Sequence, residues 1–90
     1  MSDLAAAQAE WADWVARACA ALDVDPALVD VPAIHALTKQ IAHRSVRPMA
    51  PVGAFIVGVA LGQSGGEADP TDLAARIEAL LPPPGRPPAA

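Results

Sequence analysis

Four side chains that carry or exchange protons recur at four-residue spacing, and a fifth basic residue, Arg44, lies among them. The four are His35, Lys39, His43 and Arg47. Since a helix turns once every 3.6 residues, this spacing predicts a slowly drifting stripe along one helix face. Two interpretations stay open: a solvated face with cations at a helix C-terminus, where the dipole favours them, or a docking site for an acidic or phosphorylated partner. The candidate docking residues are His43, Arg44, Arg47 and Lys39.

The sequence gives little evidence for a catalytic site or a metal-binding site. His35 and His43 are separated by about 12 Å along a helix axis, which is too far to chelate one metal ion. No nucleophile has a base beside it, and the glycines of "GQSGG" follow a predicted helix instead of a strand, unlike those of a phosphate-binding loop. We therefore predict no catalytic residue, no metal site and no cofactor. The chain is expected to be a binding or scaffolding module, not an enzyme.

The size, charge and cysteine content of the chain further limit the kinds of protein it can be. Ninety residues make one small domain, which buries only about 60–65% of its unfolded surface. A net charge of −4 argues against nucleic-acid binding, because phosphate neutralisation needs a concentrated basic surface. Cys19 is the single cysteine, so no internal disulfide is expected. Its alanine neighbours indicate a buried, structural thiol.

The most apolar stretch runs from Met49 to Gly62 and is too short for a membrane anchor. Fourteen helical residues span about 21 Å, against roughly 30 Å of hydrocarbon. The N-terminal "MSDLAAAQAEWADWV" carries acids where a signal peptide needs cations. We therefore expect a cytoplasmic protein with no membrane association.

Proline and aspartate punctuate a pattern of four helices and no strands. Residues 3–22 form the first predicted helix, and Asp25-Pro26 opens a single turn that reaches Val29. A second helix follows from about residue 31 to residue 46, because Arg47-Pro48 disfavours continuation. The third helix spans residues 51–62, and the fourth begins after Asp69 and reaches about residue 81.

The apolar spacing predicts which faces of the helices are buried. Helical periodicity groups three sets: Leu4, Trp11, Trp14, Val15, Ala18 and Leu22 on the first helix; Ile34, Leu37 and Ile41 on the second; Leu73, Ile77, Leu80 and Leu81 on the fourth. The two tryptophans are expected to anchor the core.

A structural alternative to docking for Arg47 is that its side chain caps the second helix or pairs with Asp30.

The third helix is apolar nearly all round, so we expect it to be central and covered on every side. Val52, Phe55, Ile56 and Val59 share one of its sides, and Ala54, Gly58 and Gly62 line another. A glycine inside a helix costs about 0.5–1 kcal/mol relative to alanine, which predicts a close helix crossing at Gly58. The predicted fold is therefore all-α: a small bundle of three main helices plus a short C-terminal helix. Residues 1–81 form the single domain, and the proline-rich residues 82–90 form a disordered tail.

Part of the chain resembles a known family. The stretch "WADWVARACAAL", with the following "LDVDPALVDVPAIHALTKQIAHRSVRPMAPVGAFIVGVALG", is similar to a small bacterial domain of unknown function. That domain occurs alone or fused behind nucleotidyltransferases similar to molybdenum cofactor guanylyltransferase. The family's pattern has His43, Arg47, Pro48, Ala50, Pro51, Phe55 and Gly58 at these positions. A weaker likeness, in "IAH", "RPM" and "SGGEADPTDLAARIEAL", is to the delta subunit of NAD-dependent formate dehydrogenases.

Both resemblances imply an association with molybdenum enzymes and transfer no catalytic residue. The expected function is a non-enzymatic accessory or protein-interaction module in molybdenum cofactor maturation or on a molybdoenzyme. Its expected partner is a nucleotidyltransferase-like or molybdoenzyme-related protein. The alternative is a structural subunit or a self-associating helical domain, a homo-oligomer with no cofactor role.

Overall fold

Helices make up the regular structure of the chain. The computed structural model describes residues 2–84, with side chains from residue 10 onward. Its elements are α1 (Ser2–Leu22), the 3-10 turn η1 (Pro26–Leu28), α2 (Val31–Arg44), the 3-10 turn η2 (Arg47–Met49), α3 (Ala50–Gln63) and α4 (Pro70–Glu78). No strand occurs in this range. The predicted all-α class, a small helical bundle, is confirmed.

Aspartate followed closely by proline starts three of these elements. The carboxylate of each aspartate accepts a backbone N–H that has no partner inside the helix, and proline costs nothing there because its missing N–H would be unpaired anyway. The bonds run to Asp25 from Ala27 N (3.0 Å), to Asp30 from Ala33 N (3.0 Å) and to Asp69 from Thr71 N (2.9 Å). Local sequence therefore determines where η1, α2 and α4 begin.

Two helix ends come earlier than predicted. Helix α2 stops at Arg44 instead of residue 46, because Val46 is extended (φ −115°, ψ 133°) as it enters η2. Helix α4 stops at Glu78 instead of residue 81. Leu80 and Leu81 close tighter i→i+3 turns onto Ile77 and Glu78 just before Pro82, which cannot donate to a helix.

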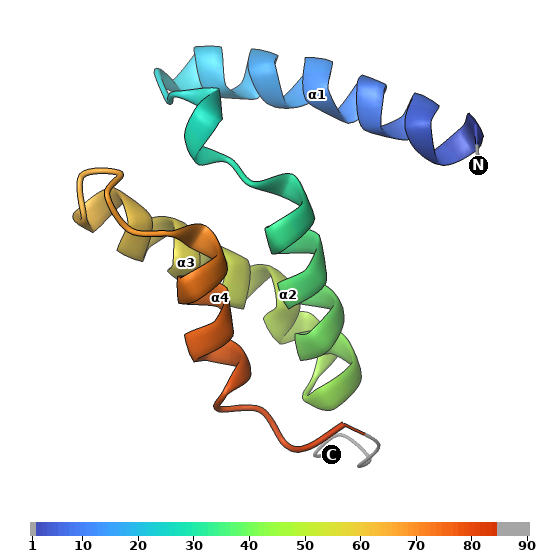
Figure 1. The fold of residues 1–90 in the computed structure, drawn as a ribbon, viewed down its shortest axis with the longest axis vertical. Helices are drawn as coiled ribbons and strands as arrows, with labels where there is room; N and C mark the ends of the chain where they lie inside the picture. The colour runs from blue at the N-terminus through green and yellow to red at the C-terminus, as the bar shows by residue number, and fades with distance from the viewer. Residues whose placement is uncertain (1, 85–90) are drawn as a thin grey trace.

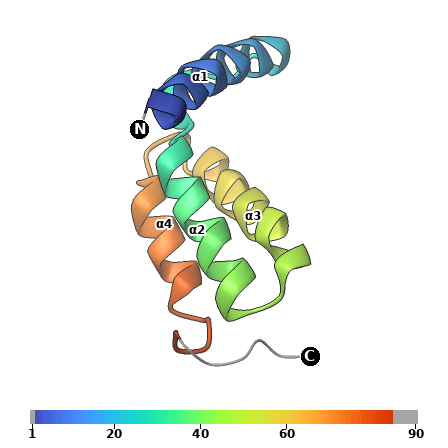
Figure 2. The same ribbon diagram turned by 90° about the vertical axis from the view of Figure 1, so that its right-hand side faces the viewer.

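Three helices pack together and the fourth lies across one end of them. Helices α2, α3 and α4 contact one another, whereas α1 contacts mainly η1. Figures 1 and 2 show α1 lying over the end of the three-helix unit at which α2 begins. The radius of gyration, 14.3 Å, exceeds the roughly 12 Å of a compact domain this long.

Asp23 ends α1 and turns the chain toward η1. It has φ +57°, a left-handed conformation that aspartate tolerates better than most residues. The next amide, that of Val24, donates back to the Cys19 carbonyl at 2.8 Å. This capping bond fixes the angle at which α1 leaves the rest of the molecule.

The hydrophobic core lies between α2, α3 and α4. Its buried members are Leu37, Ile41, Ala50, Val57 and Ala74, and Ile34, Ala42, Leu73, Ile77 and Leu81 pack against them. Leu37 has no exposed surface at all. The predicted core faces of α2 and α4 are confirmed, with one exception: Leu80 is 81% exposed, because α4 has already ended.

The prediction that α3 is covered on every side is wrong. Its buried residues are Ala50, Gly53, Val57 and Leu61, and its opposite side faces solvent. There Phe55 is 71% exposed, and Val52, Ile56 and Val59 are exposed as well. The reason is that only α2 and α4 flank α3, while α1 lies across the end of the bundle.

The close approach predicted for Gly58 occurs at Gly53 instead. A Cβ built on Gly58 meets no atom within 4 Å, whereas one on Gly53 clashes with Cδ1 of the Ile41 side chain. Gly53 lies on the side of α3 that packs against α2, and Gly58 lies outside that contact.

The tryptophans of α1 do not anchor the core as predicted. Trp14 is 65% exposed, Trp11 also remains exposed, and so does Leu22 at the end of the helix. Cys19 is buried, as expected for a structural thiol. The side chain of Leu4 lies outside those described. Helix α1 is amphipathic, but among the described residues only η1 and the start of α2 pack against its apolar stripe.

Among the described residues, no helix is both long enough and apolar enough to cross a bilayer.

Candidate functional site

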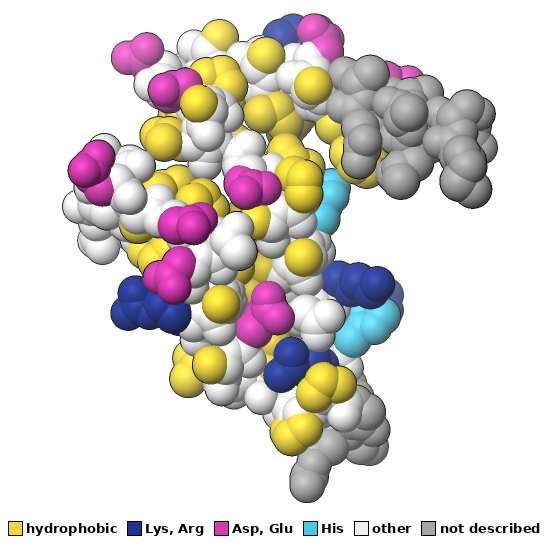
Figure 3. Space-filling view, in the orientation of Figure 1, with side chains coloured by type: hydrophobic (Ala, Val, Ile, Leu, Met, Phe, Trp, Pro, Cys, Tyr) yellow, Lys and Arg dark blue, Asp and Glu magenta, His cyan; other side chains and the backbone are white. Residues whose placement is uncertain are grey.

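The cationic stripe of α2 is present, and most of its members are open to solvent. Lys39, His43 and Arg47 are exposed, with Arg47 in η2 just beyond the helix. Figure 3 shows lysine, arginine and histidine side chains along this edge of the molecule. His35, at the start of the stripe, packs edge-to-face on Trp11 with ring centroids 5.1 Å apart. Arg47 has no ion pair or side-chain hydrogen bond with the described residues, so neither the predicted cap nor the pair with Asp30 forms.

Arg44 is turned away from this stripe and ties α2 to the end of α4. Its Nε donates to the Pro82 carbonyl at 2.8 Å, and Nη2 donates to the Glu78 carbonyl at 3.4 Å. A third bond joins Nη1 to Oε1 of Gln40 at 3.3 Å. The Glu78 carbonyl, at the end of α4, also accepts the amide of Leu81 at 3.0 Å, and Pro82 lies in the chain that follows the helix. The guanidinium of Arg44 is therefore engaged in hydrogen bonds within the fold. The docking candidates without such bonds to the described residues are Lys39, His43 and Arg47.

Replacing Arg44 by alanine is expected to destabilise the protein. The change removes two half-buried tertiary hydrogen bonds, which together contribute about 1–3 kcal/mol to the free energy of unfolding. Urea denaturation measures this loss. Arg47→Ala is the matched control, since it removes the same charge from an exposed position and should change stability by about 0.5 kcal/mol or less. Equal melting of the two variants would contradict a structural role for Arg44.

The predicted tail begins inside the described chain and continues beyond it. Pro82 is half-buried and accepts the bond from Arg44, whereas Pro83 and Pro84 are exposed. The remaining tail, residues 85–90, lies outside the described residues. Pro82 is therefore in contact with the domain through its backbone.

An apolar groove with acidic edges lies between η1 and α3. Its volume is about 480 Å³, and its side walls include Val24, Leu28 and Val29 from the η1 region. Helix α3 provides its floor, in which Ala54, Gly58 and Gly62 recur at four-residue spacing. The charged residues that line it are Asp23, Asp25 and Asp30, and no lysine, arginine or histidine is among them. We call this feature the acidic groove.

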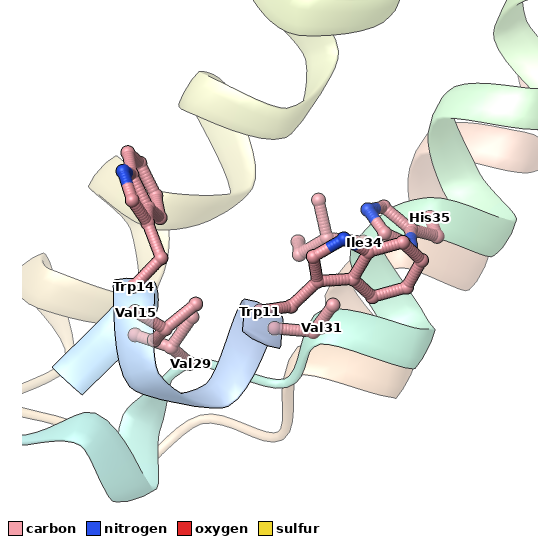
Figure 4. Close-up of a pocket in the computed structure, with 7 residues that line it drawn as sticks. All are labelled: Trp11, Trp14, Val15, Val29, Val31, Ile34 and His35. Atoms are coloured by element: carbon pink, nitrogen blue, oxygen red, sulfur yellow. The ribbon is translucent and has the colours of Figure 1, made fainter. Parts of the chain in front are cut away.

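A second hollow of about 410 Å³ adjoins the groove and lies under α1. It shares Val29 and Ile34 with the groove, so the two form one continuous apolar surface. Figure 4 shows Trp11 and Trp14 projecting from α1 in different directions, with Trp11 reaching toward His35 of α2. Both indoles line the hollow, and Trp14 is largely open to water.

Helix α3 adds an exposed apolar face that continues from the groove floor. We define the α3 apolar face by Val52, Phe55, Ile56 and Val59, all of them exposed. The helix contains no charged residue from Ala50 to Gln63. By helical geometry this face lies next to the glycine-lined floor, on the side opposite the core. Exposed apolar patches of this kind occur in proteins at sites of protein or membrane interaction and at ligand-binding grooves.

The described residues hold no group of three or more His, Cys, Asp or Glu side chains that would bind a metal ion. Cys19 is buried, with no disulfide partner. The ion pair of the described residues, Arg17 with Asp13 at 3.3 Å, is exposed on α1 and contributes little to stability. The features of the described surface are therefore its exposed apolar side chains and the charged residues beside them.

The sequence of this small helical domain matches the model of a known protein family. The profile of a family described as a domain of unknown function (DUF6457) matches residues 6–85. The chain belongs to the DUF6457 family. The match spans α1 through α4, and so includes the acidic groove, the α3 apolar face and the cationic stripe. Neither the curated proteins nor the solved structures contain a match to the chain. The expected likeness to a small domain of unknown function is thus confirmed at the level of the family.

Sequence reasoning missed the acidic groove. Leu28 and Val29 belong to the "DPALVD" connection, where two apolar residues between capping aspartates were the available signal. The row Ala54, Gly58 and Gly62 was identified from its spacing but assigned to a helix crossing. Whether another helix covers these three residues depends on where α1 lies relative to α3. No local sequence pattern predicts this placement of α1.

Proposed function

We propose that this chain is a non-enzymatic accessory module that binds another protein. The proposed partner is a protein of molybdenum cofactor maturation, such as a guanylyltransferase-like nucleotidyltransferase, or a molybdoenzyme. We further propose that the complex forms in the cytoplasm. The exposed α3 apolar face is the observation that carries the proposal of protein binding.

A helix that is apolar on all sides is normally buried, because water contact with its side chains is unfavourable. In this chain α3 keeps Phe55 and Ile56 at least half exposed while α2 and α4 cover only its other side. Aromatic side chains such as Phe55 bury about 150–250 Å² each and dominate interface energetics. A partner that covers this face would supply the missing packing.

Support for the partner class comes from the resemblance described above. "IAH" followed by "RPMAP" lies in α2, η2 and the start of α3, beside the α3 apolar face. Two of the exposed cations come directly before α3 in the chain: His43 lies in the last turn of α2, and Arg47 lies in η2, which leads into α3. They add a charged rim to an apolar contact, which is the usual composition of a protein interface.

Complex formation with candidate partners tests the proposal. We expect the chain to bind the guanylyltransferase-like nucleotidyltransferase or the formate dehydrogenase of the same organism in isothermal titration calorimetry. Phe55→Glu should weaken this binding by about tenfold or more, because it places a charge in the contact. The matched control is Leu22→Glu, which puts the same charge on an equally exposed apolar position at the end of α1.

The outcomes separate the parts of the proposal. Absence of binding to either class of protein would contradict the partner class. Binding that Phe55→Glu and Leu22→Glu weaken equally would contradict the α3 apolar face as the contact. Circular dichroism of both variants checks that the helices are retained.

A second candidate function is a structural subunit or self-associating helical domain with no cofactor role. The observation that favours it is the lack of charge on α3, because two copies of this face would meet without like-charge repulsion. Light scattering after size exclusion would then give a dimer mass that Phe55→Glu converts to a monomer mass.

A further inference from the structure

We propose that the acidic groove binds an amphipathic helix of the partner protein, whose apolar side chains are flanked by lysine or arginine. This inference rests on the proposed function, because it specifies the element by which a protein partner is recognised. It concerns a different surface from the α3 apolar face, although the two are continuous.

The shape of the groove suits a helix. Along its floor, a Cβ on Gly58 or on Gly62 would meet no atom within 4 Å, so the floor is open to another backbone or to large side chains. The walls are aliphatic, with Leu28 and Val29 on one side. A helix presents apolar side chains at i, i+3, i+4 and i+7, which is the spacing that fills an elongated apolar groove. The groove also continues past Val29 into the hollow beneath Trp14, so it accommodates several such side chains in a row.

The charge of the groove specifies the flanks of that helix. Asp23, Asp25 and Asp30 line it, and no basic residue opposes them there. Asp25 and Asp30 each use Oδ1 to cap a helix start, so the other carboxylate oxygen retains its acceptor capacity. Figure 3 shows acidic side chains beside the apolar surface between α1 and the three-helix unit. Lysine or arginine next to the apolar face of the bound helix would complement them.

Charge also argues against a second copy of this chain as the occupant. In a two-fold contact the same patch meets itself, so the three aspartates of one copy would face those of the other. Like charges in an interface oppose association. A helix from a different protein, with basic flanks, avoids this repulsion.

Two designed peptides test the proposal. Both are amphipathic helices of about 18 residues, roughly five turns, with leucine at identical positions. The remaining positions are lysine in one peptide and glutamate in the other. We expect the lysine peptide to bind the full chain and to shift the fluorescence of Trp14 to shorter wavelength as the hollow fills. The glutamate peptide should bind about tenfold more weakly or not at all, and added salt should weaken the lysine peptide's binding.

Matched variants locate the binding site. Asp23→Asn, Asp25→Asn and Asp30→Asn together remove the three charges, and asparagine preserves both the helix caps and the left-handed conformation. This triple variant should lose most of its affinity for the lysine peptide. The control triple variant, Asp13→Asn, Asp72→Asn and Glu78→Gln, removes the same charge outside the groove and should bind nearly as the parent does. Gly58→Leu fills the groove without changing charge and should block binding.

Four results would overturn the inference. These are equal binding of the two peptides, equal losses in the two triple variants, unchanged affinity in Gly58→Leu, and a dimer in which Trp14 is already protected and the peptide does not bind. None of them decides the proposed function, which is judged by complex formation with the candidate partner proteins. Conversely, a chain that binds the lysine peptide but none of those proteins would retain the groove site and lose the proposed partner class.

Discussion

Leu37→Ala is expected to lower the free energy of unfolding by about 3–5 kcal/mol. Leu37 is the large side chain of the described core that is fully buried, at 0% exposure, and it lies where α2 meets α3 and α4. Truncation forfeits its transfer energy and leaves a cavity that a tightly packed neighbourhood cannot close. A chain of this length has roughly 4–13 kcal/mol of total stability, so a large part of it is lost. Thermal and urea denaturation followed by circular dichroism measure the effect.

Leu80→Ala is the control for this prediction. It removes the same atoms from a side chain that is 81% exposed, so it should change stability by about 0.5 kcal/mol or less. Similar losses in the two variants would mean that the core is not centred on α2, α3 and α4. If Leu37→Ala does not fold at all, Leu37→Met provides the second measurement. Methionine conserves most of the side-chain volume, so this variant should retain cooperative unfolding.

Two glycines in one helix are expected to respond to alanine with opposite signs. Gly58→Ala should raise the free energy of unfolding by about 0.5–1 kcal/mol, because it improves helix propensity at a position with open space around the new methyl group. Gly53→Ala should lower it by about 1–2 kcal/mol. Its Cβ displaces the side chain of Ile41, which is only 3% exposed, and overpacking outweighs the gain in propensity.

The pair shares its helix, its substitution and its assay, so the difference between the two variants isolates packing from propensity. Chemical denaturation of both variants and the parent gives that difference directly. Stabilisation by Gly53→Ala would show that Ile41 moves aside at little cost. Destabilisation by Gly58→Ala would restore the close helix crossing expected from sequence.

Local chemistry accounts for the parts of the fold that sequence predicted correctly. Asp25, Asp30 and Asp69, each followed by a nearby proline, mark the starts of η1, α2 and α4, because capping needs only residues that are neighbours in the chain. The same holds for the buried face of α2, where Leu37 and Ile41 follow from helical periodicity. The all-α class follows from these local signals.

Tertiary structure decided which of the apolar faces predicted from sequence are in fact covered. Trp14, Phe55 and Gly58 each carry a local pattern typical of a core, yet all three are exposed, because α1 lies across the end of the bundle instead of over α3. The candidate docking residues divided in the same way: Arg44 reaches the carbonyls of Glu78 and Pro82, far away in sequence, while Arg47 reaches neither. Periodicity states which side of a helix is apolar. Whether another element covers that side depends on long-range packing between helices, and this packing leaves the acidic groove and the α3 apolar face open.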